Sequence, residues 1–389
     1  MSIQTPAAPK RDLFEAEHEA YRESFARFLQ AEVVPYAKDW EAAGIVPREL
    51  FTKSAEHGFL AMDVPEEYGG SGVDDWRFNV ILTEEAAYAG VGDSMMGTGL
   101  HTDIVLPYLM SAATEEQRDR WFPGIASGEL ILAIAMTEPG TGSDLAAIKT
   151  SAKLDGDAYI LNGAKTFITN GINADLVIVA ARTNEHPHKG LSLFVVERGM
   201  DGFERGKQIE KIGQHASDTA ELFFNDVRVP AENMLGPEGS GFIQLVSRLV
   251  PERISLATGA IAGAESVLQM TIDYAKERHA FGKPISSFQN TRFVLADLKA
   301  KVVTTRCFVD RCVERYCAGT ATVEEAAMAK WLTSDLLCEV ADAGVQIHGG
   351  YGYTTDYPIS KAWVDARVLR IYAGTNEIMK ELVGRSMGL

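Results

Sequence analysis

One glutamate of this chain stands where a helical pattern meets a helix-breaking residue. Glu252 follows Pro251 and precedes Arg253, within helical periodicity that runs from about 242 to 277. Because proline lacks a backbone donor, we expect the helix to bend or to restart at this point. A carboxylate there can stabilise the local helix N-terminus, or, if buried, it can act as a general base with a raised pKa. The residues alone leave both roles open.

Four other stretches contain residue types that bind anions or planar rings. Residues 136–144 read Met-Thr-Glu-Pro-Gly-Thr-Gly-Ser-Asp, which taken alone is typical of a turn. Residues 167–171 read Phe-Ile-Thr-Asn-Gly, which also fits an ordinary strand end with a buried aromatic ring. Residues 277–284 include Arg278, whose planar fork of donors suits a pyrophosphate better than lysine does, although a solvated helix end has a similar composition.

The fourth stretch, residues 346–352, reads Gln-Ile-His-Gly-Gly-Tyr-Gly. Its glycines allow close approach of backbone to a ligand, but they lack the full dinucleotide-binding fingerprint. His348 could serve in acid–base chemistry, and a structural histidine with satisfied hydrogen bonds is the simpler interpretation.

These four motifs and a fifth at 371–377, Ile-Tyr-Ala-Gly-Thr-Asn-Glu, resemble in type and order those of the FAD-dependent acyl-CoA dehydrogenase family. The resemblance covers essentially the whole chain. The common form of the fifth motif reads Tyr-Glu-Gly-Thr, and its glutamate removes the substrate α-proton. Here Ala373 takes that place. In long-chain-type and isovaleryl-type members the base is instead a glutamate just before an arginine on the mid-chain helix, which corresponds to Glu252.

The long-chain-type members look most similar, because the chain also carries Tyr-Pro-Ile-Ser-Lys-Ala at 357–362. The resemblance implies FAD contacts from Ile134, Met136, Thr137, Gly142, Ser143, Phe167, Ile168, Thr169, Arg278, Phe281, Gln289, Gln346, Gly349, Gly350, Thr375 and Glu377. It implies substrate contacts from Ser143, Arg253, Ala373 and Gly374, and no metal ion. The small residues at 97–99 are further candidates for an acyl pocket.

The reaction implied by the resemblance is α,β-dehydrogenation of an acyl-CoA to a trans-2-enoyl-CoA. Glu252 would take the α-proton, flavin N5 would accept the β-hydride, and the backbone amide of Ala373 would help polarise the thioester carbonyl. Electrons would pass to an electron-transfer flavoprotein. Two alternatives remain: a flavin oxidase or monooxygenase with the same fold, and a non-catalytic FAD/CoA-binding subunit of a mixed oligomer, which the alanine at 373 favours.

The motif around Arg278, Phe281 and Gln289 also bears on assembly. In the family these groups serve the FAD of a neighbouring subunit, so the resemblance implies an oligomer, with a homotetramer as the family expectation.

Composition narrows the partners and the compartment. The formal net charge is -17, from 54 acidic and 37 basic residues, which argues against nucleic acid and anionic membranes as general partners. Residues 1–10 have no apolar signal region or Arg-rich transit pattern, and no run is long enough to span a membrane, so we expect a cytoplasmic protein. The four cysteines, at 307, 312, 317 and 338, lack zinc-site spacing and are expected to be buried free thiols.

The elements that must position these residues fall into three regions. Helical periodicity covers about 12–128, and short alternating runs indicate strands from about 131. The segments 176–181, 191–196 and 220–225 are predicted as further strands, and helical periodicity returns from 239. Asp155-Gly156 and Asn162-Gly163 are predicted tight turns between strands. Segregated helices and strands predict an α+β chain rather than a Rossmann fold. We expect an N-terminal helical domain (1–130), a barrel-like central β-sheet domain (131–235) and a C-terminal four-helix-type bundle (236–389).

Overall fold

The first third of the chain is helical, as predicted. The computed structural model describes residues 11–389, so the expectation about a leader at 1–10 lies outside the described residues. In chain order the helices are α1 (Ala16–Phe28), α2 (Ala37–Ala43), α3 (Glu49–Glu56), α4 (Arg77–Tyr88), α5 (Met96–Gly99), α6 (Leu106–Ala112) and α7 (Glu115–Ala126). Two π-helical turns, η1 (Leu29–Val33) and η3 (Leu100–Val105), follow α1 and α5.

Side-chain spacing and caps explain these helices. Phe25, Phe28 and Leu29 recur at three- and four-residue steps, and all three are buried in the core of this region. Helix α2 ends at Gly44 with φ of 76°, a left-handed conformation that favours glycine. Thr114 caps α7 by accepting a hydrogen bond from the backbone N–H of Gln117, whose side chain in turn accepts from the N–H of Thr114.

The middle of the chain forms one eight-stranded sheet. Its strands are β1 (Leu132–Ala135), β2 (Ser151–Asp155), β3 (Ala158–Thr169), β4 (Leu176–Arg182), β5 (Leu191–Glu197), β6 (Phe203–Gln208), β7 (Thr219–Pro230) and β8 (Met234–Leu235). The strand order is β6-β7-β3-β2-β4-β5-β8, with β1 paired to β4 in parallel. Most other neighbours are antiparallel, which agrees with the exclusion of a Rossmann fold.

One of the two predicted tight turns is wrong. Gly156 lies in the turn between β2 and β3, as expected, but Asn162 and Gly163 lie inside β3. The pairing of β3 with β7 shifts register between Leu161 and Gly163, so this glycine marks a bulge. Its φ is 154°, and an added Cβ would meet Thr150 Oγ1 at 2.4 Å. An Asn-Gly pair therefore indicates that the chain departs from regular strand geometry. Whether the departure is a turn or a bulge depends on the neighbouring strands.

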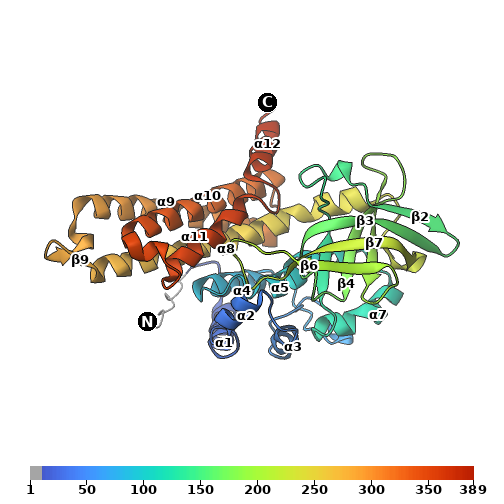
Figure 1. Ribbon diagram of the computed structural model, residues 1–389, viewed down its shortest axis with the longest axis horizontal. Helices are drawn as coiled ribbons and strands as arrows, with labels where there is room; N and C mark the ends of the chain where they lie inside the picture. The colour runs from blue at the N-terminus through green and yellow to red at the C-terminus, as the bar shows by residue number, and fades with distance from the viewer. Residues whose placement is uncertain (1–10) are drawn as a thin grey trace.

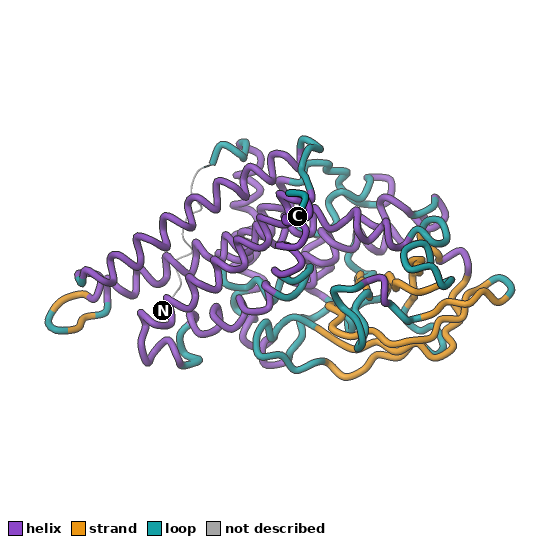
Figure 2. The backbone as a smooth tube through the Cα atoms, turned by 90° about the horizontal axis from the view of Figure 1, so that it is seen from above, coloured by secondary structure: helices purple, strands orange, loops and turns teal. Residues whose placement is uncertain are grey.

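The last third of the chain is a helical bundle. Its helices are α8 (Gly241–Glu277), α9 (Gln289–Cys317), α10 (Val323–His348), α11 (Pro358–Ala366) and α12 (Asn376–Ser386), with the hairpin β9 (His279–Ala280) and β10 (Lys283–Pro284) between α8 and α9. Helix α8 starts beside the sheet and runs along the molecule, and the β9 hairpin forms the opposite tip (Figure 1, Figure 2). We expected a bend or a restart at Pro251, and the restart is wrong, because α8 continues through this residue as one 37-residue helix.

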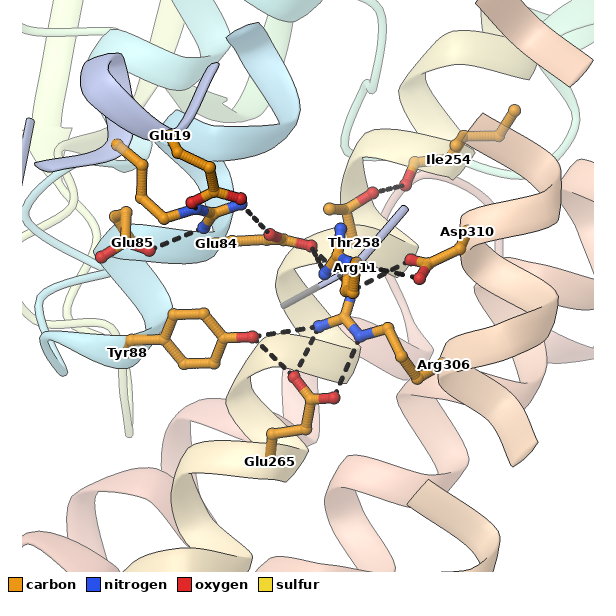
Figure 3. Close-up of polar contacts among 11 residues, drawn as sticks. Arg11, Glu19, Glu84, Glu85, Tyr88, Ile254, Thr258, Glu265, Arg306 and Asp310 are labelled. Atoms are coloured by element: carbon orange, nitrogen blue, oxygen red, sulfur yellow. Dashed lines mark hydrogen bonds and ion pairs between the residues drawn. The ribbon is translucent and has the colours of Figure 1, made fainter. Parts of the chain in front are cut away.

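A buried ionic network fastens the N-terminal helices to this bundle (Figure 3). Arg306 of α9 pairs with Glu84 of α4 at 2.7 Å and with Glu265 of α8 at 2.7 Å. Glu84 is fully buried and also pairs with Arg22 of α1 at 3.2 Å and with Arg11 at 2.7 Å. Tyr88 donates to Glu265 at 2.6 Å. This network of buried ion pairs thus holds the N-terminal helices against the C-terminal bundle.

Two other expectations can be compared with the fold. The four cysteines are free thiols, but Cys307 and Cys317 are exposed in the single chain, so the expected burial is wrong for them. Both lie on the solvent-facing side of α9, whereas Cys312 faces the bundle core. Over residues 11–389 every helix is too short or too polar to cross a lipid bilayer.

Candidate active site

Glu252 lies inside the protein, on the part of α8 that faces α6. Its side chain is 6% exposed, and its Oε1 accepts a 3.1 Å hydrogen bond from the hydroxyl of Tyr108. Burial raises the pKa of Glu252 to about 7, while the hydrogen bond from Tyr108 and the charge of Arg253 oppose that rise. A carboxyl with such a pKa can exist as the base near neutral pH and hold a proton once it has accepted one.

The turn that contains Ala373 meets α8 at Arg253, the residue that follows this glutamate. Ala373 and Gly374 both have left-handed backbone conformations, with φ of 54° and 88°. A Cβ added to Gly374 would lie 3.6 Å from Nη2 of Arg253, so the arginine next to Glu252 packs against this turn. The two segments that sequence reasoning linked, 252–253 and 373–374, are therefore neighbours in space.

Arg253 has an unusual environment. It is 3% exposed, and its Nε has no hydrogen-bond partner among residues 11–389. Burial lowers its pKa, with the nearby carboxyl of Glu252 opposing that change. A buried guanidinium with an unpaired donor favours a polar or anionic group in the space beside it.

The glycine-rich loop at 136–144 is held by a buried ion pair. Lys165 of β3 is fully buried, and its Nζ contacts Glu138 Oε1 at 2.9 Å and the carbonyl oxygen of Met136 at 3.0 Å. Glu138 also accepts from the backbone N–H groups of Lys149 and Thr150, each at 2.8 Å. The loop's own residues Gly142 and Ser143 are exposed. The contacts of Lys165 and Glu138 thus fix the loop backbone on the side that faces the sheet, while Gly142 and Ser143 stay accessible.

The second motif lies next to this loop. The backbone N–H of Thr166 donates to the carbonyl oxygen of Thr137 at 3.0 Å, which brings 136–144 and 167–169 together. Phe167 has φ of 58° at an irregularity in the β3–β7 pairing, and its side chain is 64% exposed. Strained backbone and an exposed aromatic ring beside an accessible loop are typical of a ligand site. The alternative of an ordinary strand end with a buried phenylalanine is wrong. Ile168 is buried and Thr169 is half-buried.

The candidate acyl-pocket residues adjoin this motif. Asn170 Nδ2 donates to the carbonyl oxygens of Gly97 at 2.9 Å and Leu132 at 3.0 Å. A Cβ added to Gly97 would lie 2.5 Å from Asn170 Oδ1, so the small residue permits close packing of α5 against the strand end.

A second group of predicted residues lies at the other end of the chain's longest axis. Arg278, Phe281 and Gln289 are exposed at the tip beside β9, far from the sheet (Figure 1, Figure 2). A groove of about 420 Å³ there is lined by residues that include Arg278, Gly349 and Gly350. Gln346 is also exposed at this end of α10. One chain therefore does not bring these residues to the loop at 136–144.

His348 fits the structural interpretation. Its Nδ1 donates to the carbonyl oxygen of Gly344 at 2.7 Å, and its ring stacks on Tyr274 with 4.0 Å between centroids. Burial lowers its pKa. Thr375 and Glu377 also have local roles: Thr375 caps α12 by accepting from the N–H of Ile378, and Glu377 is exposed in the first turn of that helix.

The residues fit FAD in two separate parts. An added Cβ would find no other atom within 4 Å at Gly140, Gly349 or Gly350, so backbone at both ends can be approached closely. The loop with Phe167 offers amides and an aromatic face for a planar ring. The tip offers Arg278, which suits a pyrophosphate. Among residues 11–389 no group of three or more His, Cys, Asp or Glu side chains is arranged to hold a metal ion.

A cavity of about 1080 Å³ borders Arg248 and Pro251 of α8 and Pro107 of α6. Neither Glu252 nor Tyr108 lines it. Its other walls carry five aspartates and Glu314. Because these charges would repel phosphates, we do not place the CoA part of a substrate there.

Sequence reasoning missed four residues of this region: Tyr108, Glu138, Lys165 and Lys330. Each is nearly or fully buried and bonded to a segment far away in sequence. Lys165 and Lys330 offered a signal, since a lysine within an apolar run must find a partner. Tyr108 offered none, because a tyrosine in a helical pattern is ordinary core.

Comparison with known proteins agrees with these motifs. Three family models match in succession: acyl-CoA dehydrogenase N-terminal domain at 15–129, middle domain at 133–227 and C-terminal domain at 239–388. The long-chain specific acyl-CoA dehydrogenase of rat mitochondria (Rattus norvegicus) is 46% identical over 394 residues, covering 99% of this chain and 91% of the rat protein.

Solved structures agree in fold. A crystal structure of an acyl-CoA dehydrogenase from Geobacillus kaustophilus matches with a TM-score of 0.95 and 48% identity, covering 98% of this chain and all of that one (100%). A structure described as the FAD complex of PigA matches with a TM-score of 0.90 and 28% identity, covering 97% and 98% of the two chains.

Proposed function

The chain belongs to the acyl-CoA dehydrogenase family, and we propose that it oxidises an acyl-CoA thioester to a trans-2-enoyl-CoA with FAD as cofactor and Glu252 as base. One observation carries this proposal. Glu252 is buried, has a pKa of about 7 and lies on α8 beside the turn whose Ala373 occupies the family's common glutamate position. A proton acceptor is therefore available next to a turn that has lost its own.

The turn retains a role that needs no side chain. Its backbone N–H groups can donate to the thioester carbonyl oxygen, which makes the adjacent α-proton more acidic. Ala373 therefore replaces the carboxylate without removing this donor. Arg253, with an unpaired Nε, adds positive charge near the same point. Bound FAD supplies the acceptor for the hydride that leaves the β-carbon as Glu252 takes the α-proton.

We assign the flavin ring to the end of β1, at the buried Ile134, and to the loop after it with Met136, Thr137, Gly142 and Ser143. Phe167, Ile168 and Thr169 lie beside this loop. The exposure of Gly142 and Ser143 and the exposed ring of Phe167 support the assignment. Ser143 and Gly374 would also contact the substrate. Thr375 and Glu377 would contact FAD from the start of α12, although both serve that helix in the single chain.

Anaerobic bleaching of the yellow protein by a panel of acyl-CoAs tests the proposal. Wild type should bleach with at least one chain length, and Glu252→Gln should keep FAD while bleaching slows by about 10³-fold, because the amide accepts no proton. Glu23→Gln, on the exposed face of α1, makes the same chemical change as a control. Bleaching of Glu252→Gln at a rate near that of wild type would remove Glu252 as the base.

The same experiment separates the alternatives. The loss of the glutamate at 373 favours a non-catalytic FAD/CoA-binding subunit, and that reading is supported if no acyl-CoA bleaches wild type. A flavin oxidase or monooxygenase would instead bleach and then recover its colour rapidly in air. Slow recovery in air, with fast recovery by an electron-transfer flavoprotein, supports the dehydrogenase and its electron acceptor.

We further propose a homotetramer in which Arg278, Phe281, Gln289, Gln346, Gly349 and Gly350 bind the FAD of a neighbouring subunit. These residues are exposed, and they lie at the tip of the molecule opposite the sheet and its glycine-rich loop (Figure 1). Both observations support the shared site. Mixed oligomers provide a sharp test. Chains with Glu252→Gln and chains with Arg278→Met should each be inactive alone but regain activity when refolded together. Each restored site would combine Glu252 of one chain with Arg278 of the other. Failure to regain activity in oligomers shown to be mixed would oppose the shared site.

A further inference from the structure

Among residues 11–389, the hydroxyl of Tyr108 is the only hydrogen-bond partner of the Glu252 carboxylate. The tyrosine lies on α6 and the glutamate on α8, so the bond joins two helices 144 residues apart in sequence. Tyr108 is 1% exposed and Glu252 is 6% exposed. Neither group can exchange this partner freely for water, so the bond fixes the position of the carboxylate.

The bond engages one carboxylate oxygen only. Tyr108 donates to Oε1 at 3.1 Å, which leaves Oε2 without a donor from the described side chains. Burial raises the pKa of the Tyr108 phenol well above its ordinary value, so this group remains a neutral donor at working pH. A tyrosine that cannot itself take the substrate proton, but can hold the base by its other oxygen, is suited to positioning.

We propose that Tyr108 is a positioning residue that holds Glu252 by Oε1, directs Oε2 to the substrate α-proton and stabilises the ionised base. This inference rests on the proposed function, because it requires that Glu252 be the base. It adds a donor from α6, a helix that contains none of the family motifs described above. The long helix α8 alone fixes only the Cα of Glu252, and its side chain has three rotatable bonds.

The charged groups around Glu252 set the expected direction of the pH effect. Tyr108 from α6 and Arg253 from α8 favour the ionised carboxylate, and burial opposes it. Arg248 of α8 acts on Tyr108, and Lys330 of α10 lies within the electrostatic reach of Arg253. Removal of the phenol hydroxyl leaves these charges in place and removes one donor to the anion. The pKa of Glu252 should then rise, so more of the enzyme is protonated and inactive at neutral pH.

The test compares flavin reduction by a saturating acyl-CoA from pH 6 to 9 in wild type, Tyr108→Phe and Tyr88→Phe. Wild type should lose activity on the acid side as Glu252 is protonated. Tyr108→Phe should retain FAD, lose about tenfold in rate near pH 6 and recover most of the loss near pH 9. The reason is that the acid limb of its pH–rate profile, where Glu252 becomes protonated, should move up by about one pH unit. Tyr88→Phe removes another buried tyrosine donor to a carboxylate, that of Glu265, and should leave the limb unmoved.

A second substitution should move the acid limb in the opposite direction. Site-specific 3-fluorotyrosine at position 108 keeps the ring and provides a stronger donor, so the acid limb should move down. It also retains the buried contacts if Tyr108→Phe fails to fold. A loss of rate that is equal at every pH, or an acid limb that neither variant moves, would overturn the positioning role.

The outcomes distinguish this inference from the proposed function. If Glu252→Gln abolishes reduction while both changes at 108 leave the acid limb in place, Glu252 is the base and Tyr108 does not position it. If Glu252→Gln reduces FAD as fast as wild type does, the assignment of the base is wrong, and the inference falls with it.

Discussion

Lys330 of α10 donates a 2.7 Å hydrogen bond to the carbonyl oxygen of Gly374, and so supports the turn that carries Ala373. Its Nζ also donates to Oδ1 of Asn376 at 2.9 Å. The lysine is fully buried, and burial followed by the charge of Arg253 lowers its pKa to about 8. Lys330 thus holds the turn in which Ala373 and Gly374 have left-handed backbone conformations.

Lys330→Met should destabilise the protein. Methionine nearly conserves the volume but removes the donor to the carbonyl oxygen of Gly374, while Oδ1 of Asn376 can still accept from Ser334. An unsatisfied buried group costs about 1–3 kcal/mol, so we expect the free energy of unfolding to fall by about that amount, measured by urea denaturation of the FAD-loaded protein. Lys276→Met, at a 64% exposed side chain, is the control and should change it by less than about 0.5 kcal/mol. An equal effect of the two changes would contradict the supporting role.

Lys165→Met should weaken the hold of the glycine-rich loop. It leaves Glu138 charged and buried without its cation, and removal of one partner of a buried ion pair typically costs about 3–5 kcal/mol. Because Lys165 also contacts the carbonyl oxygen of Met136, we expect FAD affinity to fall with stability. Fluorescence titration of the apoprotein measures this affinity, and Lys149→Met, at an exposed position nearby, is the control. Unchanged affinity with lowered stability would restrict Lys165 to a folding role.

Glu84→Gln should loosen the junction of the two helical regions in Figure 3. Burial opposes ionisation of Glu84, but the charges of Arg306, Arg11 and Arg22 outweigh it, so its pKa is lowered. A lowered pKa means that the group stabilises the folded state above its ordinary titration range and loses that contribution as pH falls. The variant should therefore lose about 3–5 kcal/mol at pH 7, with a smaller difference in acid.

The control for this junction is an exposed pair. Glu381 bonds Arg385 on α12 with both side chains more than half exposed, so Glu381→Gln should cost less than about 0.5 kcal/mol. Urea denaturation at pH 7 and pH 4 compares the two variants. A loss for Glu84→Gln that is as small as that for Glu381→Gln would show that the network adds little net stability.

The sequence predicted the order of the three regions and the strands at 176–181, 191–196 and 220–225. The first two strands are buried throughout 176–181 and 191–196, so a short apolar run indicates them, whereas burial alternates along 220–225. It also linked Glu252 to the turn at 373–374, although only through resemblance to a family. It failed at Asn162-Gly163, where pairing with β7 overrides the local turn preference. The restart expected as one alternative at Pro251 is also wrong, because α8 is continuous despite the missing donor.

The missed partners have a common physical cause. Tyr108 and Lys330 act through hydrogen bonds to residues 144 and 44 positions away, and no local pattern reports such pairs. The burial of Glu252, which raises its pKa, likewise depends on helices that lie elsewhere in the sequence. Motifs report the residues that face a ligand, whereas the residues that hold those motifs in place become visible only with the fold.

His101, in the π-helical turn η3, should make the protein sensitive to acid. It is fully buried, and the backbone N–H of Leu132 donates to its Nδ1 at 3.3 Å. Burial lowers its pKa from 6.5 to about 4. Between these values the unfolded chain binds a proton that the folded protein does not, so stability contributed at neutral pH is lost as pH falls from about 6.5 to about 4. The loss approaches about 3 kcal/mol.

His101→Gln tests this assignment, because glutamine can accept from the N–H of Leu132 but does not titrate. The difference in free energy of unfolding between wild type and variant should shift in favour of the variant by about 3 kcal/mol between pH 7 and pH 4, measured by urea denaturation. The same change at the exposed His215 controls for the loss of a histidine. A difference between wild type and His101→Gln that stays constant over this range would mean that His101 takes up its proton equally in the folded and unfolded states. Burial would then not oppose its protonation.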